Sequence, residues 1–327
     1  MISFAGKLKW YATIRNADAA VEIKIWRAKE DIMINFLNKI SRYHATFSYF
    51  NFVLTSFLSN EIKQYIYSVN IPFYKYQGTG NDFVLIDNRN GRFPLQDQQR
   101  ITKICDRRFG IGSDGVIVLQ NQNGVDFVMH YFNADGQLGS FCGNGGRCVV
   151  AFAKQLGIID KQANFAAFDG LHDATISGNI VSLSMRDVDH VKTYPTYAFL
   201  DTGSPHHVEF VKDTKTLDVR TQGASIAHNE IYGEEGTNVN FVELIEARHI
   251  HVRTFERGVE NETLSCGTGV TAAALAAFST GKIRNSKIEV QTLGGDLTVS
   301  FTPHNKGFID IVLTGPTELV FSGTLEL

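Results

Sequence analysis

The sequence lacks the long uninterrupted hydrophobic run that a membrane span needs. Its longest apolar stretch, residues 47–58, is interrupted by Ser48, Asn51, Thr55 and Ser56 and is too short to cross a bilayer. A basic start followed by an apolar run and a small-residue cleavage site, the pattern of a secretory signal peptide, is missing as well. We therefore expect no membrane partner.

An excess of positive charge is also missing. The chain has 31 Lys and Arg against 34 Asp and Glu, so its net charge is −3, and no stripe of aromatic residues and arginine is present. This composition argues against a nucleic-acid partner. The four cysteines form no Cys-x-x-Cys or Cys/His pair, which argues against structural zinc and against a disulfide framework. We expect a reducing, cytoplasmic environment.

Proline and glycine are almost absent from the first 70 residues, which contain no proline and only Gly6. All six prolines and 28 of the 29 glycines follow. A short helix is predicted at 28–37. Because no residue spacing in this segment is typical of catalysis, we expect residues 1–71 to be an N-terminal extension of doubtful function, or an over-extended start before a protein that begins near Val69.

From residue 72 the sequence is typical of short strands, glycine turns and few helices. Helices are predicted at 95–108, 142–156 and 267–280, and strands at 73–77, 83–87, 115–120, 126–132, 163–168, 173–177, 180–185, 197–202, 206–211, 239–246, 249–255, 286–292, 295–301 and 308–313. Several strands and a helix that follows a glycine turn occur twice. This indicates a repeated α+β pattern, unlike the regular alternation of a dinucleotide-binding fold.

A Cys-Gly-x-Gly run occurs twice. The runs Cys142-Gly143-Asn144-Gly145 and Cys266-Gly267-Thr268-Gly269 each precede an apolar stretch and a glycine stop, which predicts a helix that begins at each cysteine. Free amide groups and the helix dipole favour a thiolate there. Two such thiols facing one carbon could remove a proton from one face and return it to the other, as in a cofactor-independent racemase or epimerase. Cys105 and Cys148 lack this setting and are interpreted as packing residues.

A polar loop that leaves a strand precedes each cysteine of the repeat. Asn133 lies before Cys142, and Glu256 and Arg257 lie before Cys266. An amide and a guanidinium group can hold a substrate carboxylate. The carboxylate of Glu256 could orient an ammonium group or hold a proton beside a cysteine.

Two weaker signals lie between these loops. His206 follows a rigid Ser-Pro bend, and histidine ordinarily titrates near neutral pH, so it could poise a thiol. Asn238 and Asn240 alternate with Val239 and Phe241, so both amides should point to one face of a strand. By themselves these signals do not define a site.

Taken together, these runs resemble the diaminopimelate epimerase family. The matching runs occur in the family's order and cover about residues 72–327; they are 73–83, 110–114, 132–136, 142–147, 203–206, 255–258 and 265–269. The resemblance implies an α+β fold of two pseudo-symmetric lobes, each a strongly curved, mostly antiparallel or mixed sheet wrapped round a central helix. It implies an N-terminal lobe of residues 72–187 plus about 316–327, a C-terminal lobe of residues 188–315, and an active site between them.

The resemblance also implies an activity. It is the interconversion of LL- and meso-2,6-diaminopimelate, in lysine and peptidoglycan precursor biosynthesis, by a homodimer without pyridoxal phosphate, another cofactor or metal. By position, Cys142 and Cys266 are the base and acid, assisted by His206 and Glu256. The implied substrate contacts are Asn81, Asn133, Gly143, Asn144, Asn238, Glu256, Arg257, Gly267 and Thr268.

Three departures from the family pattern concern substrate recognition. Many members have glutamine where this chain has Gly115, and asparagine where it has Ser204. The stretch from Glu256 to Cys266 is one residue longer than the common form.

The residue pattern is also compatible with other functions. A proline or hydroxyproline racemase is similar around its two cysteines, but commonly has histidine where this chain has Asn144. The isomerase of phenazine biosynthesis is related but lacks the cysteine pair. A non-catalytic amino-acid-binding protein and a thiol redox protein are alternatives from other classes.

Overall fold

A computed structural model describes residues 10–16, 19–25 and 70–326 and divides the chain into two compact units, Met1–Ser68 and Val69–Leu327. In the first unit, the described residues form an antiparallel hairpin of β1 (Trp10–Asn16) and β2 (Ala19–Ile25). The helix predicted at 28–37 lies outside the described residues.

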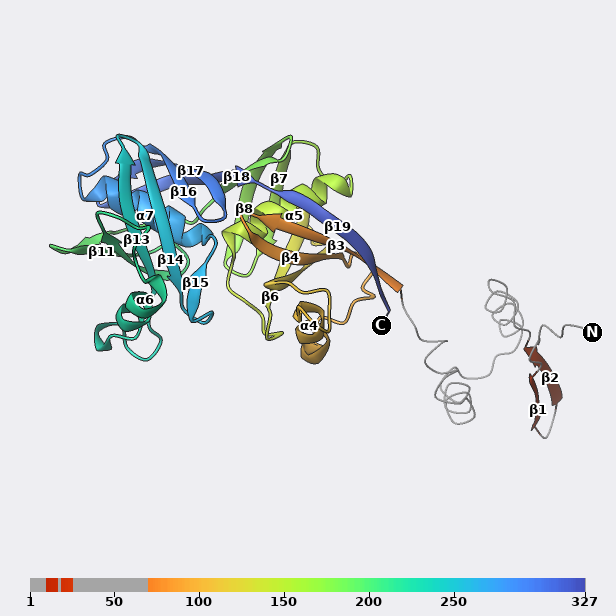
Figure 1. Ribbon diagram of the computed structural model, residues 1–327. Coiled ribbons are helices and arrows are strands. Elements are labelled where there is room, and N and C mark those ends of the chain that lie inside the picture. Colours follow the sequence, from red (N-terminus) through yellow and green to blue (C-terminus); the bar gives the residue numbers. More distant parts are fainter. Residues whose placement is uncertain (1–9, 17–18, 26–69, 327) are drawn as a thin grey trace, which may run out of the picture. The chain divides into compact units, whose positions relative to one another are not determined.

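Short strands dominate the second unit, as the sequence indicates (Figure 1). Its first half comprises β3 (Asn70–Gly78), β4 (Asn81–Asp87), α4 (Gln98–Cys105), β5 (Gly115–Gln120), β6 (Phe127–Asn133), α5 (Gly143–Gln155), β7 (Gln162–Ala167), β8 (Gly170–Ser177) and β9 (Ile180–Ser184). Its second half comprises β10 (Lys192–Thr193), β11 (Tyr197–Asp201), β12 (Pro205–Phe210), α6 (Val219–Ala227), the 3-10 turn η1 (Glu230–Tyr232), β13 (Asn238–Glu246), β14 (His249–Glu256), β15 (Asn261–Thr263), α7 (Gly267–Ser279), β16 (Lys287–Thr292), β17 (Gly295–His304) and β18 (Gly307–Pro316). The last strand, β19 (Glu318–Glu326), returns to pair with β3.

The two halves repeat one strand order. In the first half, β3 to β9 pair in sequence as antiparallel, parallel, antiparallel, parallel, antiparallel and antiparallel neighbours. The strands β11, β12, β13, β14, β16, β17 and β18 pair in the same sequence of orientations. Strand β18 also pairs with β9, so one sheet continues through both halves (Figure 1). The predicted pseudo-symmetric α+β fold is confirmed.

One helix occupies the core of each half. Helix α7 (GTGVTAAALAAFS) is buried from Gly267 to Ala277, as expected for a helix that is apolar on all sides. Helix α5 buries the ring of Phe152, which packs on Tyr74 at a centroid distance of 5.0 Å. Because truncating a buried phenylalanine costs about 3–5 kcal/mol, this packing holds α5 in the core.

The shorter helices cover the outer faces of the sheet. Helix α4 buries Ile101 and Ile104 in a cluster with strands β4 and β5, and α6 buries Val219 and Ala227 against β13 and β14. Strands covered on both faces carry nearly continuous apolar runs, as β5 does with GVIVLQ.

The structure differs from the prediction at two helices, one shorter than predicted and one not predicted. The helix predicted at 95–108 begins at Gln98, because the Asp97 carboxylate caps it by accepting the Arg100 amide hydrogen bond, and it ends at Cys105. Helix α6 was not predicted, because its sequence has Gly223 at its centre. A side chain there would lie 2.3 Å from Cβ of Phe255, so glycine is required by packing.

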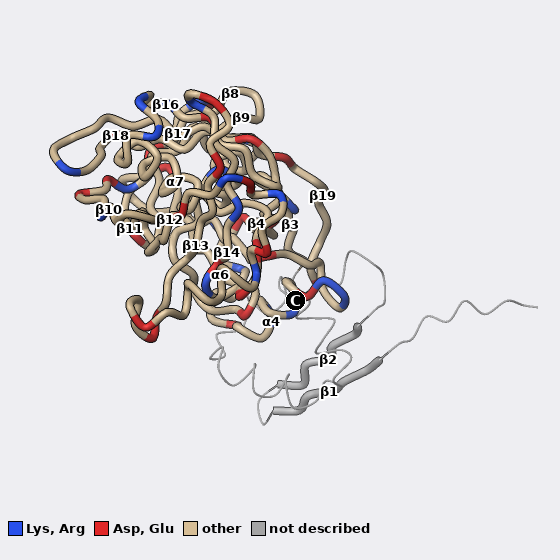
Figure 2. Tube along the Cα trace, turned by 60° about the vertical axis from the view of Figure 1, so that its left-hand side comes forward, with Lys and Arg blue, Asp and Glu red and all other residues tan. Residues whose placement is uncertain are grey.

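Charge of both signs is distributed over the surface. Figure 2 shows Lys and Arg interspersed with Asp and Glu along the second unit. No helix in the described part of the chain has the length and hydropathy to span a membrane.

Candidate active site

Both cysteines of the repeat lie at helix N-caps with nearly the same backbone conformation. Cys142 (φ −111°, ψ 114°) precedes α5, and Cys266 (φ −120°, ψ 114°) precedes α7. The Gly145 amide donates to Sγ of Cys142 at 3.5 Å, and Sγ of Cys266 lies 3.4 Å from Oγ1 of Thr268. The predicted position of each thiol at a helix start is therefore confirmed. Cys105 and Cys148 are buried, as expected of packing residues.

The two helix starts touch each other. A Cβ atom added to Gly143 would lie 3.6 Å from Cα of Gly267, and one added to Gly267 would lie 3.2 Å from both Cα of Gly143 and the amide nitrogen of Asn144. Neither glycine has a positive φ, so the constraint is one of space: Gly267 lies tight against Gly143 and Asn144, and Gly143 lies tight against Leu313. The glycine after each cysteine thus brings the two N-termini, with their outward-facing amide groups, to one place.

Asn144 joins the two helix starts through its side chain. Its Nδ2 donates to the carbonyl of Ser265 at 2.9 Å and to Oδ1 of Asn81 at 3.3 Å. Its Oδ1 accepts from Nη1 of Arg147 at 3.0 Å. The Cys142 thiol lies 3.6 Å from the same Asn81 oxygen. Asn81, Cys142 and Asn144, identified separately in the sequence, form one connected group with the residue before Cys266.

Arg147 is a buried cation beneath this group. It is 0% exposed, and no carboxylate among residues 70–326 pairs with it. Besides Asn144, it reaches the carbonyl of Gly143 at 3.4 Å and Oγ1 of Thr79 at 3.2 Å. Burial lowers its pKa to about 10, so it stays charged at neutral pH. The sequence showed Arg147 at the end of a matching run, but only the structure shows its charge below the first turn of α5.

Asp114 orients Asn81. Its Oδ2 accepts from Nδ2 of Asn81 at 2.7 Å, which leaves the Asn81 oxygen facing Cys142 and Asn144. Arg107 holds Asp114 at 2.7 Å. No role was predicted for Asp114, because 33 residues separate it from Asn81.

The second half contributes Asn238, Arg257 and Glu256 at neighbouring strand ends. The Asn238 side chain accepts the Arg257 amide hydrogen bond at 2.9 Å. The Arg257 guanidinium donates to the carbonyl of Glu235 at 3.0 Å and remains partly exposed. Glu256 is the last residue of β14, and burial raises the pKa of its carboxyl.

His206 is completely buried beside Asn240. Nδ2 of Asn240 lies 3.0 Å from Nδ1 of His206, so a neutral ring carries its proton on Nε2, an atom without a partner among residues 70–326. The pKa of His206 is lowered to about 3, mainly by burial and also by the charge of Arg257. The sequence suggested that His206 titrates near neutral pH, and burial prevents this. The alternation of residues 238–241 is confirmed, since Val239 and Phe241 pack towards α6.

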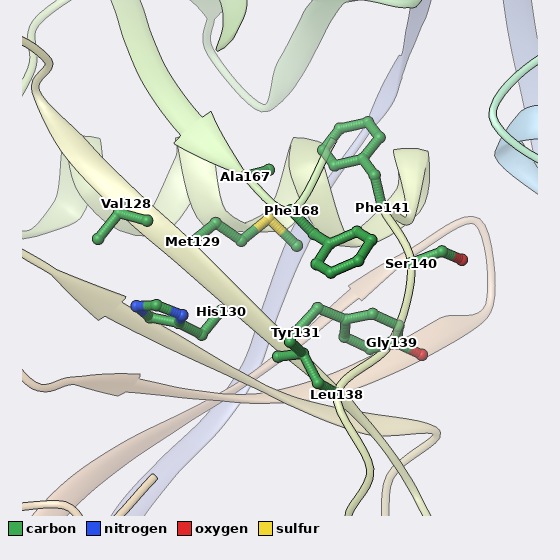
Figure 3. Close-up of a pocket in the computed structure, with 10 residues that line it drawn as sticks. All are labelled: Val128, Met129, His130, Tyr131, Leu138, Gly139, Ser140, Phe141, Ala167 and Phe168. Atoms are coloured by element: carbon green, nitrogen blue, oxygen red, sulfur yellow. The ribbon is translucent and has the colours of Figure 1, made fainter. Parts of the chain in front are cut away.

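The side chain of Asn133 makes no hydrogen bond to this network among the described residues. It ends β6, is exposed, and has Oδ1 at 3.0 Å from the Cβ position of Gly139. The loop after it borders a pocket of about 220 Å³ lined by Tyr131, Leu138, Phe141 and Phe168 among others (Figure 3). Neither cysteine of the repeat lines this pocket.

Burial outweighs the helix dipole at both thiols. The pKa of Cys142 is raised to about 11, mainly by burial and also by the charge of Glu256, while the Gly145 amide opposes the shift. Burial also raises the pKa of Cys266, as do Glu256 and Cys142. The helix N-termini were expected to favour thiolates, but a local residue pattern does not reveal the cost of a charge at a buried position. Both thiols are protonated at neutral pH before a substrate binds.

The site combines two thiols, a ring of amides and free helix N-termini. Such an arrangement can bind a carboxylate at the helix starts and exchange protons at a carbon between the sulfur atoms. Within the described residues, no three His, Cys, Asp or Glu side chains cluster as metal ligands do.

Solved structures share the fold at low sequence identity. The Bacillus anthracis phenazine biosynthesis protein of the PhzF family superposes with a TM-score of 0.64 at 15% identity, covering 79% of this chain and 100% of that one. A hydroxyproline epimerase from Agrobacterium vitis superposes with a TM-score of 0.61 at 14% identity, covering 79% and 93%. These likenesses establish the fold alone.

Sequence comparison is more specific. A family model described as diaminopimelate epimerase matches residues 73–187 and 198–320. The diaminopimelate epimerase of Flavobacterium psychrophilum is 52% identical over 256 residues, covering 78% of this chain and 100% of the relative. That of Chlorobaculum tepidum is 44% identical over 260 residues, covering 76% and 99%. The chain belongs to the diaminopimelate epimerase family.

Proposed function

We propose that this protein is an isomerase that interconverts LL- and meso-2,6-diaminopimelate by proton transfer between Cys142 and Cys266. This reaction serves lysine and peptidoglycan precursor biosynthesis. The observation that carries the proposal is the contact between two helix N-termini, each capped by a thiol, through Gly143 and Gly267. Family membership supplies the substrate.

The proposed chemistry needs one thiolate and one thiol. The thiolate takes the α-hydrogen as a proton, which leaves a planar carbanion, and the opposite thiol protonates the other face of that carbon. The two cysteines thereby exchange their protonation states, so the reverse reaction starts from the other one. Because burial keeps both free thiols protonated, one of them must give its proton to a base as the substrate binds. We assign this role to the Glu256 carboxylate, and the positive charge of the substrate's ammonium group favours the thiolate.

Helix-start amides stabilise the carbanion in this proposal. Gly143, Asn144, Gly267 and Thr268 occupy the first turns of α5 and α7, where backbone N–H groups have no carbonyl partner within the helix. A carboxylate held there can accept the developing negative charge. We assign Asn81, Asn133, Asn238, Glu256 and Arg257 to binding the rest of the substrate, and His206 and Glu256 to assisting the thiols.

Conversion of LL-diaminopimelate by the purified protein tests the function. ¹H-NMR in D₂O follows formation of the meso isomer and replacement of the α-hydrogen by deuterium, with L-proline as the comparison substrate. We expect both changes with diaminopimelate and neither with L-proline. Turnover of L-proline alone would identify a proline racemase instead. Binding of diaminopimelate without exchange would indicate a non-catalytic binding protein.

We further propose that residues 72–187 with 316–327 and residues 188–315 are the two lobes, and that the protein is a cytoplasmic homodimer. The free state of all four cysteines supports a reducing location. The exposed consecutive residues Leu319, Val320 and Phe321 on β19 support a second copy as partner. Light scattering should give the mass of two chains, and subcellular fractionation should recover the protein with cytoplasmic markers.

A further inference from the structure

The ring of Tyr131 fills a slot between two glycines. A Cβ atom on Gly115 would lie 2.6 Å from Cε2 of Tyr131, and one on Gly139 would lie 2.6 Å from Cδ1 on the same ring. Phe83 holds the ring edge-on at a centroid distance of 5.9 Å. Figure 3 shows the Tyr131 ring beside the loop that carries Gly139. Tyr131 is thus positioned by residues on β4, β5 and this loop.

Both glycines are required by the space that the ring occupies. Neither has a positive φ, so other residues could adopt their backbone conformations. The Cβ position of Gly115 is also closed by the carbonyl of Phe132 at 2.5 Å. A longer side chain at position 115, such as the glutamine of many family members, does not fit beside Tyr131.

The hydroxyl of Tyr131 is available to a ligand. No residue among 70–326 hydrogen-bonds it, and it is not among the side-chain atoms closed off from solvent. Tyr131 lies near the proposed site. Burial is the main cause that raises the pKa of Tyr131 well above its ordinary value, and the charges of Cys142 and Glu256 are the next largest causes. The hydroxyl therefore keeps its proton and can only donate to an anionic ligand.

We propose that Tyr131 is a substrate-binding residue whose hydroxyl donates a hydrogen bond to a carboxylate of bound diaminopimelate, in place of the side chain that position 115 lacks. This inference rests on the proposed function. The two glycines, Gly115 and Gly139, leave the space that the Tyr131 ring occupies, so the three residues depend on one another. The carboxylate is then contacted by a residue of β6, and not by a side chain at position 115 on β5.

Tyr131→Phe tests the proposal, because it keeps the ring in its slot and removes only the hydroxyl. We expect KM for LL-diaminopimelate to rise about tenfold, as for one lost hydrogen bond to a charged group, while kcat stays within about twofold. Tyr74→Phe is the matched control, since Tyr74 is a partly buried tyrosine that packs on Phe152 away from the thiols. Its KM should equal that of the wild type.

A second variant covers the case in which Tyr131→Phe alters the fold. Gly139→Ala places a methyl group against the ring and should raise KM by displacing the hydroxyl. An unchanged KM in a folded Tyr131→Phe variant overturns the inference. If the wild type itself fails to epimerise diaminopimelate, the proposed function is wrong instead, so the two failures are distinguishable.

Discussion

Replacing Asn144 by alanine should destabilise the protein far more than an ordinary polar substitution. The change removes hydrogen bonds to Ser265 and Asn81 and the bond accepted from Arg147. Two neutral bonds are worth about 1 kcal/mol each, and a bond to a charged group is worth about 1.5–3 kcal/mol. The free energy of unfolding should therefore fall by about 3–5 kcal/mol, a large part of the stability of a typical domain.

The loss is large because Arg147 is buried without a carboxylate among residues 70–326. Its remaining contacts, to Gly143 and Thr79, are the longer ones. Urea unfolding followed by circular dichroism measures the change. Asn164→Ala is the control, because it removes an exposed hydrogen bond to Asp173 and should cost less than about 1 kcal/mol. A loss below about 1 kcal/mol for Asn144→Ala would refute the view that this amide holds the two helix starts together.

Further predictions concern the titratable groups of the site. In a Cys266→Ala variant, alkylation of Cys142 by iodoacetamide should accelerate about tenfold per pH unit between pH 7 and 10, because the pKa of Cys142 is about 11; a plateau below pH 9 would contradict this. Adding Glu256→Gln removes a negative charge that raises the thiol pKa, so alkylation at pH 8 should become faster, and a slower reaction would contradict the assignment. His206 has a pKa of about 3 when folded and about 6.5 when unfolded, so the unfolded state binds the proton first as the pH falls, and stability is lost between those values. Between pH 7 and pH 5 the wild type should lose about 2 kcal/mol more than His206→Gln in urea unfolding, and equal losses would show that His206 is not buried as a neutral ring.

Local signals made part of the site predictable from the sequence. Cys-Gly-x-Gly followed by an apolar stretch is a local pattern, and both cysteines lie at the predicted helix starts. The alternation of Asn238 and Asn240 with apolar residues likewise survives, because strand geometry alone determines which side chains share a face. The repeat of several strands and a helix after a glycine turn is likewise a local pattern, whereas the order in which those strands pair is not.

Long-range contacts were not predictable from these patterns. Asn144 reaches the carbonyl of Ser265 across 121 residues, and Asp114 orients Asn81 across 33 residues, and no local spacing signals either contact. The raised thiol pKa values have the same origin, since burial depends on how the two halves pack. Helix α6 was not predicted, because glycine is unfavourable inside a helix. Gly223 is required there by the Phe255 side chain that packs against it.

The central claim is that two thiols act on opposite faces of one carbon, and single-cysteine variants test it most directly. Cys142→Ala and Cys266→Ala are each given LL-diaminopimelate in D₂O, and formation of the meso isomer is followed by ¹H-NMR beside the wild type. We predict that each variant loses epimerisation, because one face of the carbon then has no proton donor or acceptor. Near-normal turnover by either variant would contradict the two-thiol mechanism.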